Sequence, residues 1–420
     1  MLKMLPVAFA AALLLAACSK QEAPQAEAPA AAAAPAADAA KPADAPVADA
    51  KPADAAPAAA AGGELVVQIG HVAPTSGAIA HLGKDNENGG RLAVEDLNAE
   101  NFMIGDKRAK FELVPEDDAA DPKQATAVAQ LLVDKKVNGV VGHLNSGTTI
   151  PASAIYAKAG IPQITPSSTN PQYTRQGYKT AFRAVADDVK LGGTLGKYTV
   201  DTLKGKTVVV IDDRTAYGQG LADEYTKALE AAGVKPADRQ FTNDKATDFT
   251  AILTAIKAKK PDVVFFGGMD AVGGPMLRQM KQLGITAKFV GGDGLCTGEL
   301  YKLSGQSFGD NQVYCAEAGG ADGEYKTKMD DFKKRFKEKF GVEVQIYAPY
   351  VYDSVMMLAN AMKEAGSSDP AVYLPKLAAT TGYKGVTGEF SFDEKGDNKN
   401  ASMTLYTYKG GKREVLEILH

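Results

Sequence analysis

Hydroxyl side chains gather in one loop at the end of an apolar run. Residues 141–153 read VGHLNSGTTIPAS, so Ser146 and Thr149 precede a predicted helix that begins near Pro151. Short side chains let a ligand approach the backbone closely, and hydroxyls both donate and accept hydrogen bonds. The free N–H groups and the positive dipole end of the helix would point to the same place. We predict an anion site suited to a carboxylate, with Ser146 on the ligand and Thr149 as a helix cap; capping by both is the alternative.

A carboxylate follows another apolar run. Asp293 lies between glycines in GGDGLC, directly after the run KFV. A charged side chain at a strand end is poor core material, because a buried charge needs a partner. A loop of N–H and hydroxyl groups that faces a carboxylate across a cleft suits a zwitterion.

The same residues also permit a hydrolase. His143 and Ser146 lie three residues apart, and Asp293 could complete a catalytic triad. This alternative is the weaker one, because the chain has no G-x-S-x-G elbow and His143 directly follows a strand.

The acidic run at residues 116–122 is interpreted as a strand end followed by a helix N-cap. No metal site is predicted, since the histidines do not show ligand spacing: His71, His81, His143 and His420.

Two periodicities alternate from Glu64 onward and would position these groups. Apolar runs without polar alternation predict strands buried on both faces of a parallel sheet: LVVQIG, FELVP, VNGVVG, TVVVID, PDVVFFGG and KFVGG. Between them lie amphipathic helices, one with apolar residues at 125, 128, 129 and 132 and another at 249, 252, 253 and 256. This order predicts doubly wound α/β sheets, whose ligands bind beyond the carboxyl ends of the strands. The stretch GGMDAVGG is interpreted as a loop, because its spacing is not G-x-G-x-x-G.

Length and charge set the class of protein. The chain has 420 residues, of which 45% are hydrophobic, and a formal net charge of −4. A chain of this length exceeds one simple core, so two lobes are expected. The slightly acidic balance, without an Arg/Lys-rich block, gives no electrostatic reason to expect nucleic acid as a partner.

The N-terminus has the pattern of a targeting segment. Lys3 supplies a positive charge, a short apolar stretch follows, and LLLAAC ends with small residues before Cys18. This pattern resembles a bacterial lipobox, which implies a signal peptide over residues 1–17 and a lipid anchor on Cys18; an ordinary secretory cleavage site is the alternative. Residues 18–63 repeat Ala, Pro, Lys and Asp with little to bury, which predicts a disordered linker.

Secretion bears on the other two cysteines. Cys296 and Cys315 lie in one stretch of a chain expected in an oxidising compartment, so a disulfide is predicted rather than two free thiols. Closing this short loop would stabilise the fold by about 3 kcal/mol in the chain-entropy treatment.

Several motifs together resemble one family. In chain order they are DPKQA, GHLNSGTTIPAS, ITPSSTNP, AYGQGLA, GGMDA, GGDG and FDEKGD, from about residue 64 to about residue 399. As a set they are similar to the branched-chain amino acid binding proteins of ABC importers, which have the type I periplasmic binding fold. The resemblance implies two doubly wound parallel-sheet lobes joined by a multi-crossover hinge. Lobe 1 would comprise residues 64–185 and 318–394, and lobe 2 residues 186–317 and 395–420.

The resemblance also implies how the polar ends of an amino acid are held. Ser146 gives its hydroxyl and N–H to the α-carboxylate, helped by Thr169. The carbonyl of Ser167 and the carboxylate of Asp293 hold the ammonium group, and Tyr217 closes over the ligand from lobe 2. Asp293 is shorter than the glutamate of the family, which bears on ligand size or pose. Taken singly, Thr169 also fits a turn residue.

Other departures from the family pattern concern the ligand's side chain. Leu82 and Met269 stand at positions that are aromatic in the family, whereas Tyr347 remains aromatic. Taken singly, Met269 and Tyr347 also fit core packing. A cysteine pair sometimes found in the family is replaced by Ala120 and Asn145, and Asn145 is included among the expected ligand-binding residues.

These expectations describe a binding protein rather than an enzyme. We expect it to capture leucine, isoleucine or valine in an interlobe cleft and to deliver the ligand to the permease of an ABC importer, without a cofactor or metal. The protein would be a monomer of the periplasm or cell envelope, held to a membrane through Cys18. Another small neutral amino acid or amide as ligand, and a sensory role, are the alternatives that stay open.

Overall fold

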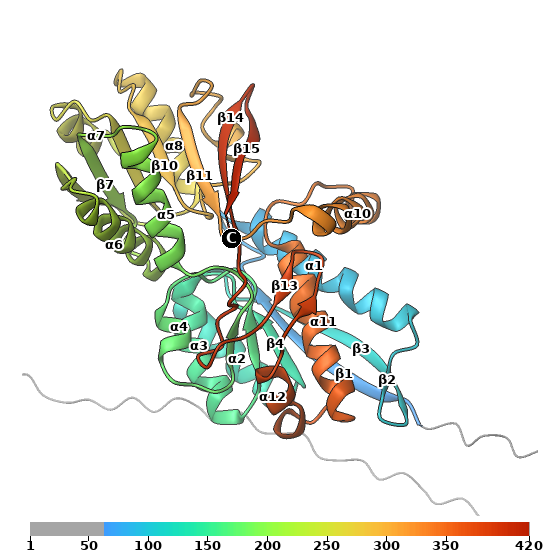
Figure 1. Cartoon of the computed structure of the whole chain (residues 1–420). Helices are drawn as coiled ribbons and strands as arrows, with labels where there is room; N and C mark the ends of the chain where they lie inside the picture. Colours follow the sequence, from blue (N-terminus) through green and yellow to red (C-terminus); the bar gives the residue numbers. More distant parts are fainter. Residues whose placement is uncertain (1–62, 420) are drawn as a thin grey trace, which may run out of the picture. The chain divides into compact units, whose positions relative to one another are not determined.

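Two mainly parallel β-sheets organise residues 63–419, the part of the chain that this computed structural model describes (Figure 1). Each sheet has its own apolar clusters, so the predicted α/β fold with two lobes is confirmed. The predicted signal peptide, Cys18 and the linker up to residue 62 lie outside the described residues. Within residues 63–419, no helix has both the length and the apolar character needed to cross a membrane.

The first sheet is built around β1. Its strand order is β2-β3-β1-β4-β5-β6, and every neighbouring pair except β2–β3 is parallel. The strands are β1 (Leu65–Ala73), β2 (Met103–Ile104), β3 (Lys107–Asp117), β4 (Gly139–Gly142), β5 (Gln163–Thr165) and β6 (Ala181–Arg183). The helices of this lobe are α1 (Ala80–Ala99), α2 (Pro122–Asp134), α3 (Ser146–Ala159), α4 (Gln172–Arg175), α10 (Gly323–Phe340), α11 (Ala348–Ala365) and α12 (Pro370–Ala378).

The second sheet has the order β15-β14-β11-β10-β9-β7-β8, with an antiparallel edge at β14 and β15. Its strands are β7 (Val208–Asp212), β8 (Asp238–Phe241), β9 (Val263–Gly267), β10 (Lys288–Gly291), β11 (Val313–Glu317), β14 (Met403–Lys409) and β15 (Lys412–Leu419). Its helices are α5 (Asp188–Asp201), α6 (Ala216–Ala231), α7 (Thr250–Lys257), α8 (Asp270–Gln282) and α9 (Leu300–Leu303). A separate antiparallel pair joins β12 (Tyr383–Lys384) to β13 (Glu389–Phe390).

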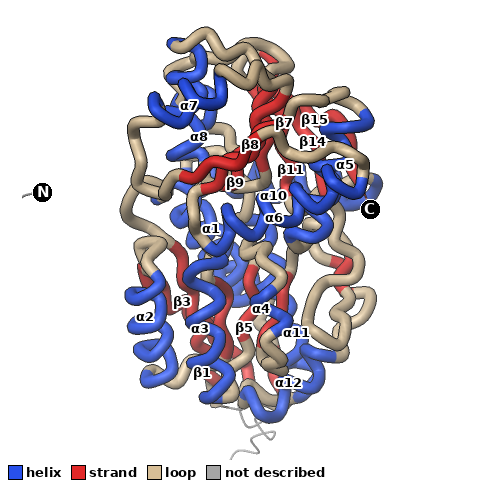
Figure 2. Tube along the Cα trace, turned by 90° about the vertical axis from the view of Figure 1, so that its left-hand side faces the viewer, coloured by secondary structure: helices blue, strands red, loops and turns tan. Residues whose placement is uncertain are grey.

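Buried side chains occupy both faces of the sheets. In β7, Val208 and Val210 belong to one apolar cluster, whereas Val209 and Ile211 belong to another. On the first sheet, α2 and α3 lie side by side over one face (Figure 2), and α1, α10 and α11 pack on the other. Burial on both faces is what continuous apolar runs predict.

Strand β3 does not follow this prediction. Most of its side chains are exposed or half-buried, so the expectation that FELVP is buried on both faces is wrong. The physical reason is its place in the sheet, because only the two-residue β2 lies beyond it at the edge.

Both predicted amphipathic helices are present. The four predicted apolar positions of α2 are buried, and Asp121 caps this helix by accepting hydrogen bonds from the N–H groups of Lys123 and Gln124 at 2.8 and 3.0 Å. The N-cap interpretation of residues 116–122 is therefore confirmed. In α7, Leu253 and Ile256 are buried against the second sheet.

The chain passes between the two sheets at three places: after β6, after β11 and before β14. Arg183 ties the first and third passages together. Its side chain is fully buried, and its Nε donates to Oδ1 of Asp397 at 2.8 Å. Its Nη1 donates to the carbonyls of Ser168 and Asn170. The lobe boundaries at residues 185, 318 and 395 stay predictions.

The predicted disulfide between Cys296 and Cys315 is present, with an S–S distance of 2.03 Å. Cys315 lies on β11, and Cys296 lies in the loop after β10. The N–H of Cys296 donates to the carbonyl of Asp293 at 2.9 Å. The disulfide therefore ties the loop that carries Asp293 to a strand inside the second sheet.

Candidate functional site

Loops from both lobes line one cavity of about 520 Å³ at the carboxyl ends of the strands. This is the place that doubly wound sheets offer to a ligand. Three of the predicted ligand-binding residues, Asn145, Tyr217 and Met269, line the cavity directly. The other lining residues are Ser76, Gly77, Ala78, Ile79, Ala119, Ala120, Pro122, Gly147, Asp213, Arg214, Thr215, Ala216, Asp244, Lys245, Ala271 and Val272.

The hydroxyl loop lies at the start of α3. This helix begins at Ser146, because Asn145 is extended and its carbonyl accepts the N–H groups of Thr148 and Thr149. The first N–H groups of a helix have no partner inside it, and here they lie beside the cavity lining at Asn145 and Gly147. The Ser146 hydroxyl is buried, and it accepts hydrogen bonds from the Asn170 N–H and the Ser168 hydroxyl, both at 3.2 Å.

Two predictions about this helix are wrong. It begins at Ser146 rather than near Pro151, which lies inside the helix. Thr149 does not cap it, because its hydroxyl donates to the carbonyls of His143 and Asn145 at 3.1 and 2.8 Å and accepts no helix N–H. The cap is the extended backbone of Asn145, a feature that a side-chain capping pattern does not predict.

Ser167 and Thr169 follow β5 in the neighbouring loop and are also buried. The Ser167 hydroxyl donates to the carbonyl of Leu144 at 3.2 Å, which joins this loop to the one before α3. The carbonyl of Thr169 accepts the N–H of Asp188 at 2.8 Å, at the start of α5 in the other lobe. The first lobe therefore brings Ser146, Ser167 and Thr169 together at its contact with the second.

Asp293 is held by two tyrosines, one from each lobe. Its Oδ1 accepts the hydroxyl of Tyr217 at 2.7 Å, and its Oδ2 accepts the hydroxyl of Tyr347 at 2.8 Å. Burial raises the pKa of the Asp293 carboxyl, and the two tyrosine hydrogen bonds offset part of that rise. Each carboxylate oxygen can accept a further hydrogen bond, so Asp293 can still receive a cationic group.

Asp188 is a residue of this site that sequence reasoning missed. It is fully buried, and neither of its carboxylate oxygens has a hydrogen-bond partner within the described residues. Burial and the nearby charge of Asp293 raise its pKa well above the usual range, although the neighbouring hydroxyl of Thr169 opposes that rise. The sequence contains one signal that could have pointed to this residue, the two adjacent acids Asp187 and Asp188. A helix needs only one N-cap residue, and Asp187 provides it for α5, so capping does not account for Asp188.

Three residues stand at positions that are aromatic in the resembled family, and only one of them lines the cavity. Leu82 is fully buried in an apolar cluster with Ile79 and Tyr347, and it is not among the residues that line the cavity. Met269 lines the cavity and packs against apolar clusters of both lobes. Tyr347 lies behind the lining and directs its hydroxyl to Asp293.

Polar contacts already join the lobes around the cavity. Nε2 of His81 lies 2.8 Å from Oδ2 of Asp270, which also accepts the Thr297 hydroxyl at 2.6 Å. Burial disfavours the charged form of His81, but the hydrogen bond and charge of Asp270 outweigh it and raise the pKa of His81. In a further contact, Nδ2 of Asn170 donates to the carbonyl of Ala216 at 2.7 Å.

His143 does not form a triad with Ser146 and Asp293. Its Nδ1 lies 2.8 Å from Oδ2 of Asp118, its Nε2 lies 3.1 Å from the hydroxyl of Tyr156, and its side chain is fully buried. Both ring nitrogens are therefore committed away from Ser146. Within residues 63–419, no group of His, Cys, Asp and Glu side chains is arranged to hold a metal ion.

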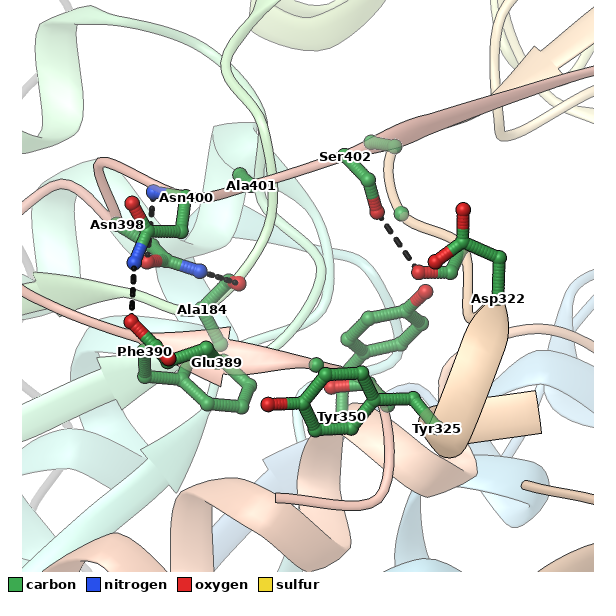
Figure 3. Close-up of a pocket in the computed structure, with 15 residues that line it drawn as sticks. Ala184, Asp322, Tyr325, Tyr350, Glu389, Phe390, Asn398, Asn400, Ala401 and Ser402 are labelled. Carbon is green, nitrogen blue, oxygen red and sulfur yellow. Dashed lines mark hydrogen bonds between the residues drawn. The ribbon is translucent and has the colours of Figure 1, made fainter. Parts of the chain in front are cut away.

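A second cavity, of about 310 Å³, lies at the passages between the lobes (Figure 3). Its polar side chains bond to neighbours. The Ser402 hydroxyl donates to the carbonyl of Gly320 at 2.8 Å, and Nδ2 of Asn400 donates to Oε1 of Glu389 at 3.2 Å. None of the predicted ligand-binding residues lines this cavity, so we place the candidate site in the larger one.

Comparison with known proteins extends over most of the chain. The family described as "Periplasmic binding protein" matches residues 66–413. The Leu/Ile/Val-binding protein homolog 1 of Brucella abortus is 36% identical over 345 residues, which cover 82% of this chain and 91% of that protein. A leucine-, isoleucine-, valine-, threonine- and alanine-binding protein of Pseudomonas aeruginosa is 35% identical over 342 residues, or 81% of this chain and 90% of that one.

Solved structures include a similar fold with a bound amino acid. The branched-chain amino acid transporter substrate-binding protein LivJ of Streptococcus pneumoniae, in complex with isoleucine, superposes with a TM-score of 0.77 at 29% sequence identity. The match covers 84% of this chain and 99% of that one.

Proposed function

Because the chain belongs to the periplasmic binding protein family, we propose that it is an extracytoplasmic binding protein for leucine, isoleucine and valine that serves an ABC importer. The amino acid is captured between the two lobes and delivered to the permease. The names of its relatives support this ligand class, since two proteins 35–36% identical over most of their length are named as a Leu/Ile/Val-binding protein homolog and as a leucine-, isoleucine-, valine-, threonine- and alanine-binding protein.

The observation that carries the proposal is a pair of buried carboxylates that lack a cation. Asp188 and Asp293 are both buried, and neither forms an ion pair within the described residues. Two such charges are costly to bury together, because each needs a partner in a low-dielectric environment. The ammonium group of an amino acid supplies the missing positive charge, and the carbonyl of Ser167 offers it a further acceptor.

The other end of the ligand is assigned to the start of α3. The α-carboxylate accepts hydrogen bonds from the N–H and hydroxyl of Ser146 and from Thr169, and the helix dipole favours its negative charge. The Thr169 hydroxyl is buried without a hydrogen-bond partner within the described residues, as expected of a group whose hydrogen-bond partner is the ligand. No cationic side chain is needed for this anion.

The side chain of the ligand meets an apolar wall. Ile79, Met269 and Val272 line the cavity with several alanines, whereas Leu82 supports the wall from behind. A charged side chain pressed against this wall would lose its hydration without a partner, at a cost of several kcal/mol. Tyr217 closes the site from the second lobe, and Asn145 lines the mouth of the anion loop.

A calorimetric screen of the amino acids tests the proposal. The full chain with Cys18 replaced by alanine is titrated with each of the twenty amino acids. We expect heats of binding for leucine, isoleucine and valine, and none for aspartate, glutamate, lysine or arginine. Binding of charged amino acids alone, or of no amino acid, would contradict the proposal.

The cell-envelope location is proposed from the N-terminal pattern. Lipid attached to Cys18 would hold the protein to a membrane. The Cys18→Ala chain should appear in the soluble fraction after processing and still bind its ligand. Retention in the membrane fraction would contradict the lipid anchor and leave the ligand assignment standing.

A further inference from the structure

Two loops, one from each lobe, carry the groups that meet at Asp293. The first loop follows β10 in the second lobe and contains Asp293 and Cys296. The other loop precedes α11 in the first lobe and contains Gln345 and Tyr347. Because the Tyr347 hydroxyl donates to Oδ2 of Asp293 at 2.8 Å, the geometry around this carboxylate depends on how the two loops are placed against each other.

Arg413 joins these two loops. It lies on β15, at the edge of the second sheet. Its Nη1 donates to the carbonyl of Cys296 at 2.6 Å, and its Nη2 donates to the carbonyl of Gln345 at 2.9 Å. A guanidinium is planar and presents its N–H groups in fixed directions, so the two hydrogen bonds set the separation of the two carbonyls.

The guanidinium of Arg413 is itself held in place. Its Nη1 lies 3.5 Å from Oε2 of Glu317, and its central carbon lies 5.2 Å from the ring centre of Tyr406. The side chains of Arg413 and Glu317 are only 19% and 13% exposed, so their attraction is screened less than that of a surface pair. These contacts fix the position from which Arg413 reaches the two carbonyls.

Short, hydrogen-bonded loops connect the two carbonyls to the site. The N–H of Cys296 donates to the carbonyl of Asp293 at 2.9 Å. In the other loop, the buried carboxylate of Asp85 accepts the N–H groups of Gln345 and Tyr347 at 2.8 and 2.9 Å. A displacement of either carbonyl is therefore passed on to the carboxylate or to the tyrosine.

We propose that Arg413 is a positioning residue for the ammonium site, because it holds the two loops at the separation at which the Tyr347 hydroxyl orients the Asp293 carboxylate. This inference rests on the proposed function, since it concerns the carboxylate that is assigned to the ligand's ammonium group. Arg413 is not among the residues that line the larger cavity, so it does not act by touching the ligand. Its effect on binding passes through Asp293 and Tyr347.

A double-mutant cycle, measured by calorimetry in the Cys18→Ala chain, tests the proposal. Arg413→Met and Tyr347→Phe should each weaken leucine binding about tenfold or more, the loss expected when one hydrogen bond to a charged group no longer forms. The double variant should bind within about threefold of the weaker single variant, because both changes disable the same contact. A loss equal to the product of the two single losses would show independent action and overturn the inference.

A branched 2-keto acid separates positioning from a general loss of structure. It has no ammonium group, so Arg413→Met should change its affinity less than about threefold. Equal losses for leucine and the keto acid would overturn the inference. Lys412→Met is the matched control, because Lys412 is the exposed neighbour of Arg413 on β15. This control should bind both ligands as the parent chain does.

Arg413→Lys keeps the positive charge beside Glu317 without the planar fork, and it carries the test if Arg413→Met does not fold. It should weaken leucine binding, and combined with Tyr347→Phe it should bind no more weakly than Tyr347→Phe alone. Parent-like leucine binding by either Arg413 variant would overturn the inference and leave the proposed function standing. If the parent chain does not bind leucine, the proposed function fails and the inference fails with it.

Discussion

At the scale of single residues, Asp293 is the strongest test of the ligand's charge. Asp293→Ala leaves the ammonium group without its buried counter-charge, so leucine affinity should fall by about 3–5 kcal/mol, a factor of hundreds or more. Calorimetry measures the loss. A branched 2-keto acid, which has no ammonium group, should bind the variant and the parent chain about equally. Asp201→Ala removes an exposed acid of the same lobe and serves as control. Undiminished leucine binding by Asp293→Ala would contradict the amino acid assignment.

Asp188 should make ligand affinity depend on pH. Its pKa and that of Asp293 are raised by burial, so both carboxyls begin to protonate at a higher pH than exposed ones. A protonated carboxyl cannot pair with an ammonium group, whereas the ligand's own charges do not change between pH 8 and pH 5. Leucine affinity should therefore fall as the pH is lowered through this range. Asp188→Asn should bind more weakly at pH 8 and show a flatter profile; identical profiles for the two proteins would remove Asp188 from the site.

At the scale of elements, the sequence predicts the strands of the sheets better than it predicts the residue at which a helix begins. Continuous runs such as VVVID are buried on both faces in the structure, because β-branched residues suit strands covered on each side. The start of α3 was missed, since its cap is the backbone of Asn145 rather than a side chain. The contact between Tyr347 and Asp293 was also missed, because it joins two lobes across 54 residues of chain and no local pattern encodes it.

Asp353, which contacts the turn between β12 and β13, should make the stability of the fold depend on pH. This buried carboxyl accepts the N–H groups of Val386 and Thr387 and the Thr387 hydroxyl, yet burial raises its pKa to about 6. The folded-state pKa thus exceeds the unfolded value of about 3.9, so its contribution to stability is complete below about pH 4 and is lost as the pH rises through about 6. Between pH 4 and pH 6, the melting temperature of Asp353→Asn should decline less with rising pH than that of the parent chain. Equal slopes in thermal unfolding would contradict this assignment.

At the scale of the whole molecule, a site divided between two lobes couples binding to their relative motion. Ser146 and Thr169 come from the first lobe, and Asp188 and Asp293 from the second, so a zwitterion contacts both sets only when the lobes are together. A ligand held by both sets would therefore stabilise the closed arrangement by its differential affinity for it. The passages after β6, after β11 and before β14 are where the backbone would bend.

Closure should be visible as a smaller radius of gyration in small-angle scattering when leucine saturates the protein. Scattering curves that are the same with and without leucine would contradict a closing cleft.

The His81–Asp270 contact should contribute to closure. The raised pKa of His81 means that its charged form favours the closed arrangement at low pH and that this contribution is lost as the pH rises through the folded-state value. His81→Ala should thus be more open than the parent chain without ligand near pH 6, and the difference should shrink toward pH 9. Leucine affinity of the variant should be lower by about tenfold or more near pH 6, as expected from one lost charge-assisted hydrogen bond. If His81→Ala leaves closure unchanged at both pH values, the proposed role of this contact is contradicted, while a closing cleft is not.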